Sequence, residues 1–216
     1  MSGTMIVNTL AGLLIITSLL VICVKRPTAS AVFYSLQSLV LVLIFVTMAT
    51  NMHAEELYAW SISAFITKVV LVPVIMYRAL GTLNDPVADK GGLGTAWTVM
   101  AGVVIVLLSF LVASAVQLPS IAALKPALGV SLGHFLLGVL CIVSQRNILK
   151  QIFGYCLMEN GAHLTLALLA YKAPELVEIG VATDSIFAVV IMTVIARQIF
   201  RTLNTLDVRQ LTALKG

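Results

Sequence analysis

Five ionisable side chains lie inside long apolar stretches of this sequence: Lys68, His134, Glu159, His163 and Asp184. An ionisable group at the depth of the hydrocarbon costs about 3 kcal/mol on insertion scales, so it persists mainly where it faces a protein interior or a wet cavity. Glu159 and His163 are four residues apart, which predicts that they share one helix face about one turn apart, within reach of proton exchange directly or through one water. We therefore interpret the five residues as candidates for a proton path.

The same residues also have a purely structural interpretation. The imidazole of His163 would satisfy the buried carboxyl of Glu159, or Lys68 would form an ion pair with Glu159 or Asp184 that holds helices together. The sequence leaves both interpretations open. Pro73, five residues after Lys68, predicts a kink and a freed backbone carbonyl near that lysine, and hence a polar pocket.

Other residues at or near membrane depth favour simpler roles. Small residues in one apolar run predict close helix packing, namely Gly129, Gly133 and Gly138. Two basic residues near the ends of runs predict interfacial anchors, Arg146 and Lys150. Four acids predict outer-surface or helix-start carboxylates, namely Glu55, Glu56, Glu175 and Glu178.

The elements that must position these residues are predicted to be transmembrane helices. The 216 residues are 60% hydrophobic and 10% charged, with a mean hydropathy of +1.08, so a soluble core could not hide the apolar surface. Each apolar run is near the ~20 residues that cross hydrocarbon as a helix. The predicted fold is an all-α, multi-pass integral membrane protein with about seven spans, at 5–24, 29–50, 57–80, 95–116, 126–144, 148–171 and 176–199.

The basic residues predict the orientation of these spans, because Lys and Arg are retained on the cytoplasmic side. The basic residues divide unequally between the two predicted sides of the membrane: one side holds ten of them and the other holds only Lys125 and Lys172, while Lys68 lies within a span. We therefore expect the N-terminus outside and the C-terminus in the cytoplasm. Ten basic residues fall on the predicted cytoplasmic side, namely Lys25, Arg26, Arg78, Lys90, Arg146, Lys150, Arg197, Arg201, Arg209 and Lys215.

Composition and motifs exclude several function classes. The net charge of +4 comes from basic residues scattered at the ends of apolar runs, which argues against nucleic acid as a partner. Cys23, Cys141 and Cys156 lack C-x-x-C spacing and are interpreted as buried small side chains. No nucleophile elbow, phosphate loop, haem motif or metal constellation is present, so we expect no active site, metal or cofactor within the chain.

The C-terminal part resembles the K subunit of respiratory complex I over about residues 126–216. The resemblance rests on FLLGVLCIVSQRNILKQIFGYCLMEN, residues 135–160, and on the ending LDVRQLTALKG. It implies a buried glutamate on each of the second and third helices of that unit, in a proton path linking antiporter-like subunits. In a gap-free alignment the first position falls on Cys156, with Glu159 three residues later, and Asp184 lies one residue from the second.

The whole chain is similar to the hydrogenase-4 component E family, through the phrases LKPAL, GHFLLG, SQRNIL, QIFGYCLMENG, APELVEIG and LTALKG. The resemblance implies a subunit of a formate hydrogenlyase-type complex in the bacterial inner membrane. Nickel–iron and iron–sulfur centres would then belong to partner subunits of the peripheral hydrogenase arm. The direct partners would be antiporter-like and other membrane subunits and the lipid bilayer.

Three functional hypotheses follow from the sequence. The first is a non-redox subunit that conducts protons and couples antiporter-like subunits through Lys68, Glu159, His163 and Asp184. The second is a structural scaffold, and the third is the small subunit of a multisubunit sodium/proton antiporter. We expect two regions, 1–117 with four spans and 118–216 with three spans and a short tail. Two stretches of the chain show the same order of features, which indicates an internal repeat. In the first, the basic loop Lys25-Arg26 is followed by Glu56-Leu57, and in the second, Gln145-Arg146 is followed by Glu175-Leu176.

Overall fold

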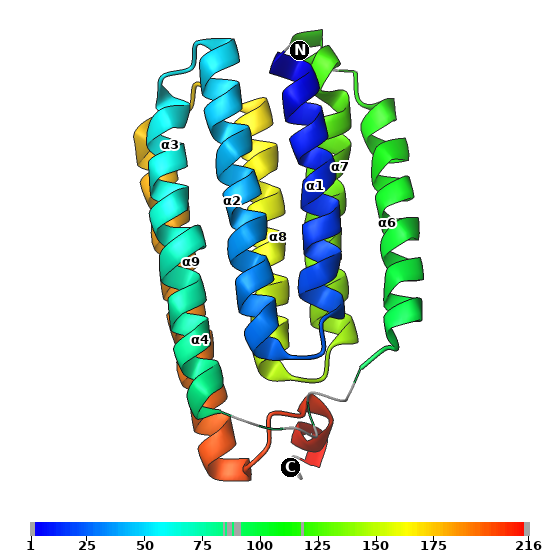
Figure 1. Ribbon diagram of the computed structural model, residues 1–216, viewed down its shortest axis with the longest axis vertical. Coiled ribbons are helices and arrows are strands. Elements are labelled where there is room, and N and C mark those ends of the chain that lie inside the picture. Colours follow the sequence, from blue (N-terminus) through cyan, green and yellow to red (C-terminus); the bar gives the residue numbers. More distant parts are fainter. Residues whose placement is uncertain (1–2, 84, 86–87, 89–91, 118, 214–216) are drawn as a thin grey trace.

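Long helices make up nearly all of the protein in the computed structural model, which describes residues 3–83, 85, 88, 92–117 and 119–213 (Figure 1). Among these residues the prediction of an all-α protein is confirmed, since beyond the helices only the isolated bridges Gly92–Gln145 and Asn147–Asp207 occur. Two residues of the predicted orientation count, Lys90 and Lys215, lie outside the described part of the chain.

Seven long helical segments correspond to the seven predicted runs within the described residues. The third is continuous but changes type, from α3 (Glu56–Ala64) through the π-helix η1 (Phe65–Leu71) to α4 (Val72–Thr82). Two short 3-10 turns are η2 (Pro119–Leu124) and η3 (Val208–Ala213). The other long helices are α1 (Gly3–Cys23), α2 (Pro27–Met52), α6 (Thr95–Ala115), α7 (Lys125–Ser144), α8 (Ile148–Leu169) and α9 (Glu175–Leu203).

Six of the seven segments in the described residues are long and apolar enough to cross a membrane, judged by length and composition. The exception, α8, has 22 residues and hence sufficient length, but it carries Lys150, Glu159, Asn160 and His163. It contacts α2, α7 and α9, so most of its surface faces protein. A helix this polar is tolerated at membrane depth because its neighbours, and not lipid, surround its polar groups.

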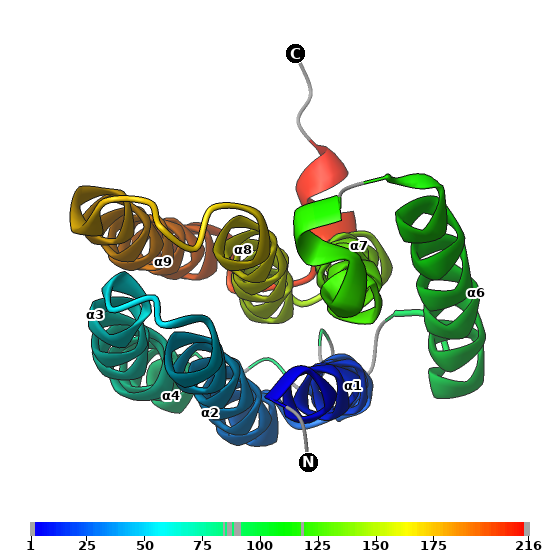
Figure 2. The same ribbon diagram turned by 90° about the horizontal axis from the view of Figure 1, so that it is seen from above.

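The helices form two facing rows, with α1, α2 and α3/α4 in one and α7, α8 and α9 in the other (Figure 2). Facing helices run in the same direction: Asn8 near the start of α1 bonds the carbonyl of Ala123, and Gln145 after α7 bonds that of Ile22 near the end of α1. Helix α6 lies outside the rows, against α7 and α1. The predicted regions 1–117 and 118–216 therefore pack into one bundle, and residue 118 lies outside the described part.

Glycines allow α7 and α8 to approach backbone to backbone. A Cβ on Gly138 would lie 2.3 Å from the backbone nitrogen of Met158, and one on Gly161 would lie 2.4 Å from that of Phe135. Gly129 instead faces the ring of Phe110 on α6, where a Cβ would lie 2.9 Å from it. The interpretation of these glycines as packing residues is confirmed at Gly138 and Gly129.

Pro73 does free a carbonyl near Lys68, as predicted. Proline has no N–H to donate to the carbonyl of Val69, four residues earlier, and the hydroxyl of Ser35 on α2 donates to that oxygen at 2.8 Å. The third span accommodates the proline by widening into the π-helix η1, which contains Lys68. Such π-turns within α-helices are frequent at functional sites.

The interpretation of Lys150 as an interfacial anchor is wrong. Its side chain is buried, and its Nζ donates to the carbonyls of Val21, Ile22 and Val24 and to the hydroxyl of Ser30. The last carbonyls of a helix have no intrahelical partners, and an ammonium is a favourable partner for them. Lys150 therefore ties the end of α1 to the starts of α2 and α8.

The two termini lie at opposite ends of the bundle (Figure 1). This placement agrees with an odd number of crossings. Which end faces the cytoplasm stays a prediction from the distribution of basic residues.

Replacing Gly138 with alanine should destabilise the bundle. Because the added methyl group would meet backbone atoms of α8 and not a movable side chain, α7 and α8 must separate, at about 1–3 kcal/mol. Denaturant titration of the purified chain in detergent measures this loss. Gly12→Ala is the matched control, since nothing lies within 4 Å of its Cβ position. Equal stability of the two variants would contradict the close packing described.

Candidate functional site

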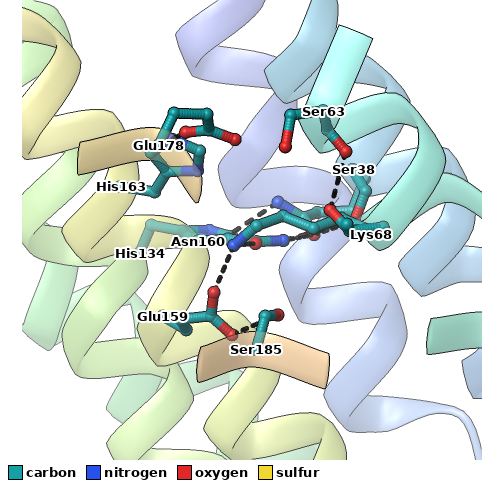
Figure 3. Close-up of polar contacts among 11 residues, drawn as sticks. Ser38, Ser63, Lys68, His134, Glu159, Asn160, His163, Glu178 and Ser185 are labelled. Atoms are coloured by element: carbon teal, nitrogen blue, oxygen red, sulfur yellow. Dashed lines mark hydrogen bonds and ion pairs between the residues drawn. The ribbon is translucent and has the colours of Figure 1, made fainter. Parts of the chain in front are cut away.

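The centre of the site is a buried ion pair between the two helix rows. Lys68 of η1 is fully buried, and its Nζ lies 2.5 Å from Oε1 of Glu159 on α8. The other carboxylate oxygen of Glu159 accepts a hydrogen bond from Ser185 of α9 at 2.7 Å. Figure 3 shows the three side chains meeting from three elements. Of the two structural pairings predicted for Lys68, the structure forms the one with Glu159.

Lys68 also begins a chain of hydrogen bonds that crosses the bundle. Its Nζ donates to Oδ1 of Asn160 at 2.9 Å, and Nδ2 of Asn160 donates to Oε1 of Gln37 on α2 at 2.9 Å. Gln37 Nε2 lies 3.1 Å from Nε2 of His134 on α7, and His134 Nδ1 lies 2.6 Å from the hydroxyl of Ser18 on α1. All five residues are buried, so the chain connects α1, α2, α7, α8 and η1 away from lipid.

The direction of these hydrogen bonds defines the tautomer of His134. Because Gln37 uses its oxygen to accept from Asn160, it presents its NH₂ group to His134 Nε2, which must accept. The proton of the neutral ring is then on Nδ1 and points to Ser18, whose own hydroxyl donates to the carbonyl of Leu14. Every donor therefore points from Lys68 toward α1.

A second buried pair lies beside the first, and it corrects two expectations. His163 Nε2 is 2.7 Å from Oε2 of Glu178 on α9, an ion-pair distance at which the groups are not aligned as a hydrogen bond. Of the two predicted roles for Glu178, the helix-start position is found, since α9 begins at Glu175, but the side chain is buried and is not at the outer surface. His163 turns to Glu178 while Glu159 turns to Lys68, so the expected direct Glu159–His163 pair is not formed (Figure 3).

Aromatic rings enclose this second pair. The His163 ring lies 4.8 Å from the Phe45 ring and 5.5 Å from the Trp60 ring, measured between centroids. Both aromatic residues are fully buried. The pair His163–Glu178 is thus enclosed by side chains of α2, α3, α8 and α9.

Asp184 does not join the buried groups. Its side chain is exposed on α9, although its neighbour Ser185 points inward to Glu159. Adjacent residues on a helix point about 100° apart, which accounts for the different environments. The expectation that Asp184 faces the interior of this chain is wrong, and the structure brings together Lys68, His134, Glu159 and His163 without it.

The arrangement can hold and exchange protons. Four titratable groups, namely Lys68, Glu159, His163 and Glu178, form two close pairs, and His134 is joined to the first pair through the amides of Asn160 and Gln37. In surroundings of low dielectric constant such hydrogen bonds polarise one another, so a change of charge at one pair is felt along the chain. Amides do not titrate, and they therefore orient the network without accepting protons.

Several residues of the site were not predicted from the sequence. One local signal was present. Gln37 and Asn160 are amides in the middle of apolar runs, where an amide without a hydrogen-bond partner costs several kcal/mol. Ser18, Ser38 and Ser185 give no such signal, because serines in membrane helices commonly bond their own backbone.

Comparison with known proteins agrees with this architecture. The profile of the family described as NADH-ubiquinone/plastoquinone oxidoreductase chain 4L matches residues 126–216. Hydrogenase-4 component E of Escherichia coli strain K12 is 60% identical over all 216 residues and the full length of both chains, and that of Shigella flexneri is equally similar. An uncharacterized protein of Mycobacterium tuberculosis is 21% identical over 213 residues, which are 98% of this chain and 97% of that one.

No solved structure matches the chain. The relatives nevertheless cover it from end to end, including the spans that precede the chain 4L-like part. With its buried Lys68–Glu159 pair between two rows of membrane helices, the chain is a multi-pass membrane protein and belongs to the hydrogenase-4 component E family.

Proposed function

We propose that this chain is a non-redox membrane subunit of a hydrogenase-4-type complex, and that it takes part in proton conduction between antiporter-like membrane subunits. The relatives that share its whole length support the assignment to such a complex. The observation that carries the role in conduction is the buried Lys68–Glu159 pair and the chain of hydrogen bonds that runs from it to α1. Nickel–iron and iron–sulfur chemistry would belong to the partner subunits.

The pair has the properties of a two-state element. A proton that binds the carboxylate of Glu159 removes the charge that stabilises the Lys68 ammonium, and a buried cation without its partner is unfavourable. Lys68 then tends to release a proton, so one proton enters at Glu159 and one leaves from Lys68 with no change in net charge. The amide of Asn160 does not titrate, so in this proposal a water or a group of a neighbouring subunit accepts the proton that leaves Lys68. Asn160 stays in place beside the lysine Nζ in both states.

Glu159 is the entry point in this proposal, because its side chain is 10% exposed while that of Lys68 is 0% exposed. It lies next to α9, where Ser185 holds one carboxylate oxygen and Asp184 faces outward one residue away. A proton delivered by a neighbouring subunit against α9 would therefore reach Glu159 first. His163 and Glu178 form the second exchange pair, and the orienting chain runs through His134 to Ser18 on α1.

The variant Glu159→Gln alone should destabilise the chain by about 3–5 kcal/mol, because the buried Lys68 loses its counter-charge and must either stay charged and unpaired or give up its proton. The double variant Lys68→Gln, Glu159→Gln removes both charges and should recover assembly of the complex. It should still abolish proton movement, by at least tenfold, in vesicles that hold the assembled complex. Electron transfer by the peripheral arm should persist.

This double variant separates conduction from a scaffold role. A purely structural subunit would regain both assembly and proton movement once the unpaired charge is gone. Ser61→Ala is a matched control, since Ser61 is buried on α3 and donates only to its own helix at the carbonyl of Leu57. Full proton movement in the assembled double variant would refute the proposed role.

The variant Asp184→Asn should leave the isolated chain as stable as the wild type, within about 0.5 kcal/mol, because the side chain is exposed. In the assembled complex we expect a loss of proton movement, since a carboxylate at membrane depth on an outer face is retained for a neighbouring subunit. Denaturant titration in detergent and proton uptake by vesicles measure the two effects. Thr183→Ala, at the adjacent exposed position, is the control. Unchanged uptake in Asp184→Asn would exclude this residue from the path.

A further inference from the structure

An apolar groove runs along the outer surface between α2 and the third span. On one side Val32, Leu36 and Leu39 follow each other at helical spacing, and on the other side Val70, Val74 and Tyr77 do the same. The groove has a volume of about 630 Å³. Eight residues of helix on each side, with seven rises of about 1.5 Å between them, give the groove a length of about 10 Å, roughly a third of the ~30 Å hydrocarbon thickness.

The floor of the groove is dry because its polar groups are already paired. The hydroxyl of Ser35 donates to the carbonyl of Val69, which Pro73 leaves without an intrahelical donor. The π-helix and the proline thus create an unusual backbone here without exposing a polar group to the groove. The groove is therefore suited to a hydrocarbon chain and not to water.

A positive charge marks one end of the groove. Arg78 belongs to its lining, is exposed, and lies one turn before the end of α4. Its guanidinium has no hydrogen bond or ion pair with another residue in the described part of the chain. Lys25 and Arg26, both exposed, lie in the turn between α1 and α2 at the same end of the bundle (Figure 1). Tyr77 beside Arg78 is 61% exposed, as is typical of aromatic residues at the membrane interface.

We propose that this groove binds an anionic phospholipid, with one acyl chain along Val32, Leu36 and Val74 and the headgroup phosphate on Arg78. A phospholipid presents an apolar chain and an anion in the same order as the groove presents its apolar length and its guanidinium. An apolar helix of another subunit would fill the groove but leave Arg78 without an anion. The site is independent of the proton path, since none of its lining residues belongs to the Lys68 chain.

The predicted orientation places Arg78 on the cytoplasmic side, where the leaflet carries anionic lipids that basic residues near the surface attract. Arginine also binds phosphate through two parallel hydrogen bonds, which lysine cannot do. Arg78→Lys should therefore retain only part of the preference for an anionic headgroup.

Native mass spectrometry of the purified full chain, titrated with phosphatidylglycerol or with phosphatidylcholine of the same acyl chains, tests the proposal. We expect the wild type to retain phosphatidylglycerol about five-fold more strongly, the preference expected from one basic residue near a charged headgroup. Arg78→Gln should remove the preference, and Arg201→Gln, an exposed arginine at the same end of α9, should keep it. Equal retention of the two lipids by the wild type would overturn the proposal.

A second variant tests the acyl-chain part of the site. Val74→Phe should fill the groove and weaken retention of both lipids, whereas Val104→Phe on the exposed face of α6 should not. Both positions are exposed, so neither substitution disturbs the core. A photoreactive residue at position 74 should label lipid in native membranes. Labelling of a protein helix there instead, or lipid retention unaffected by Val74→Phe, would refute the site.

Discussion

The arrangement of the two helix rows depends on one constraint, namely that the buried ammonium group of Lys68 needs hydrogen-bond acceptors and a negative charge from the protein. Lys68 is fully buried, and its ammonium group donates two hydrogen bonds to protein groups. Glu159 supplies the charge and Asn160 a carbonyl, both from α8. Once these two are fixed, their remaining polar atoms need partners in turn, and Ser185, Gln37 and finally His134 provide them. The polar contacts between the two rows of helices therefore follow from the need to satisfy Lys68.

Helix α8 contains Glu159, Asn160 and His163, and its position in the bundle explains why a membrane helix can hold so many polar side chains. The glycines at positions 138, 154 and 161 bring α7 and α8 together at backbone distance, so that one side of α8 is sealed from lipid. The facing row supplies Gln37 and Lys68 on the other side. Polar side chains and small residues thus have complementary roles: the small residues exclude lipid, and the polar residues are satisfied where lipid is excluded.

The sequence predicted the seven helices closely because apolar length and the breaks between runs are local properties. It also identified Lys68, Glu159 and His163 as buried groups, since a charge in an apolar run is rare. It named Glu159 as one of two partners for Lys68 without choosing between them, and it did not identify Glu178 as the partner of His163. Glu178 was expected at the outer surface or at a helix start. It does lie at the start of α9, but the packing of α9 against α8 buries its side chain. Asp184 was expected inside, yet the rotation of α9 that directs Ser185 inward turns Asp184 outward.

Helix α6 lies apart from both rows, and it is needed to bring the polypeptide back to the side of the bundle at which the first row begins. A row of three helices begins at one membrane face and ends at the other, so a second row attached directly would be upside down relative to the first. One additional crossing by α6 returns the polypeptide to its starting face (Figure 1). Because of this return crossing both rows have the same polarity, and each helix of one row runs parallel to the helix that it faces in the other.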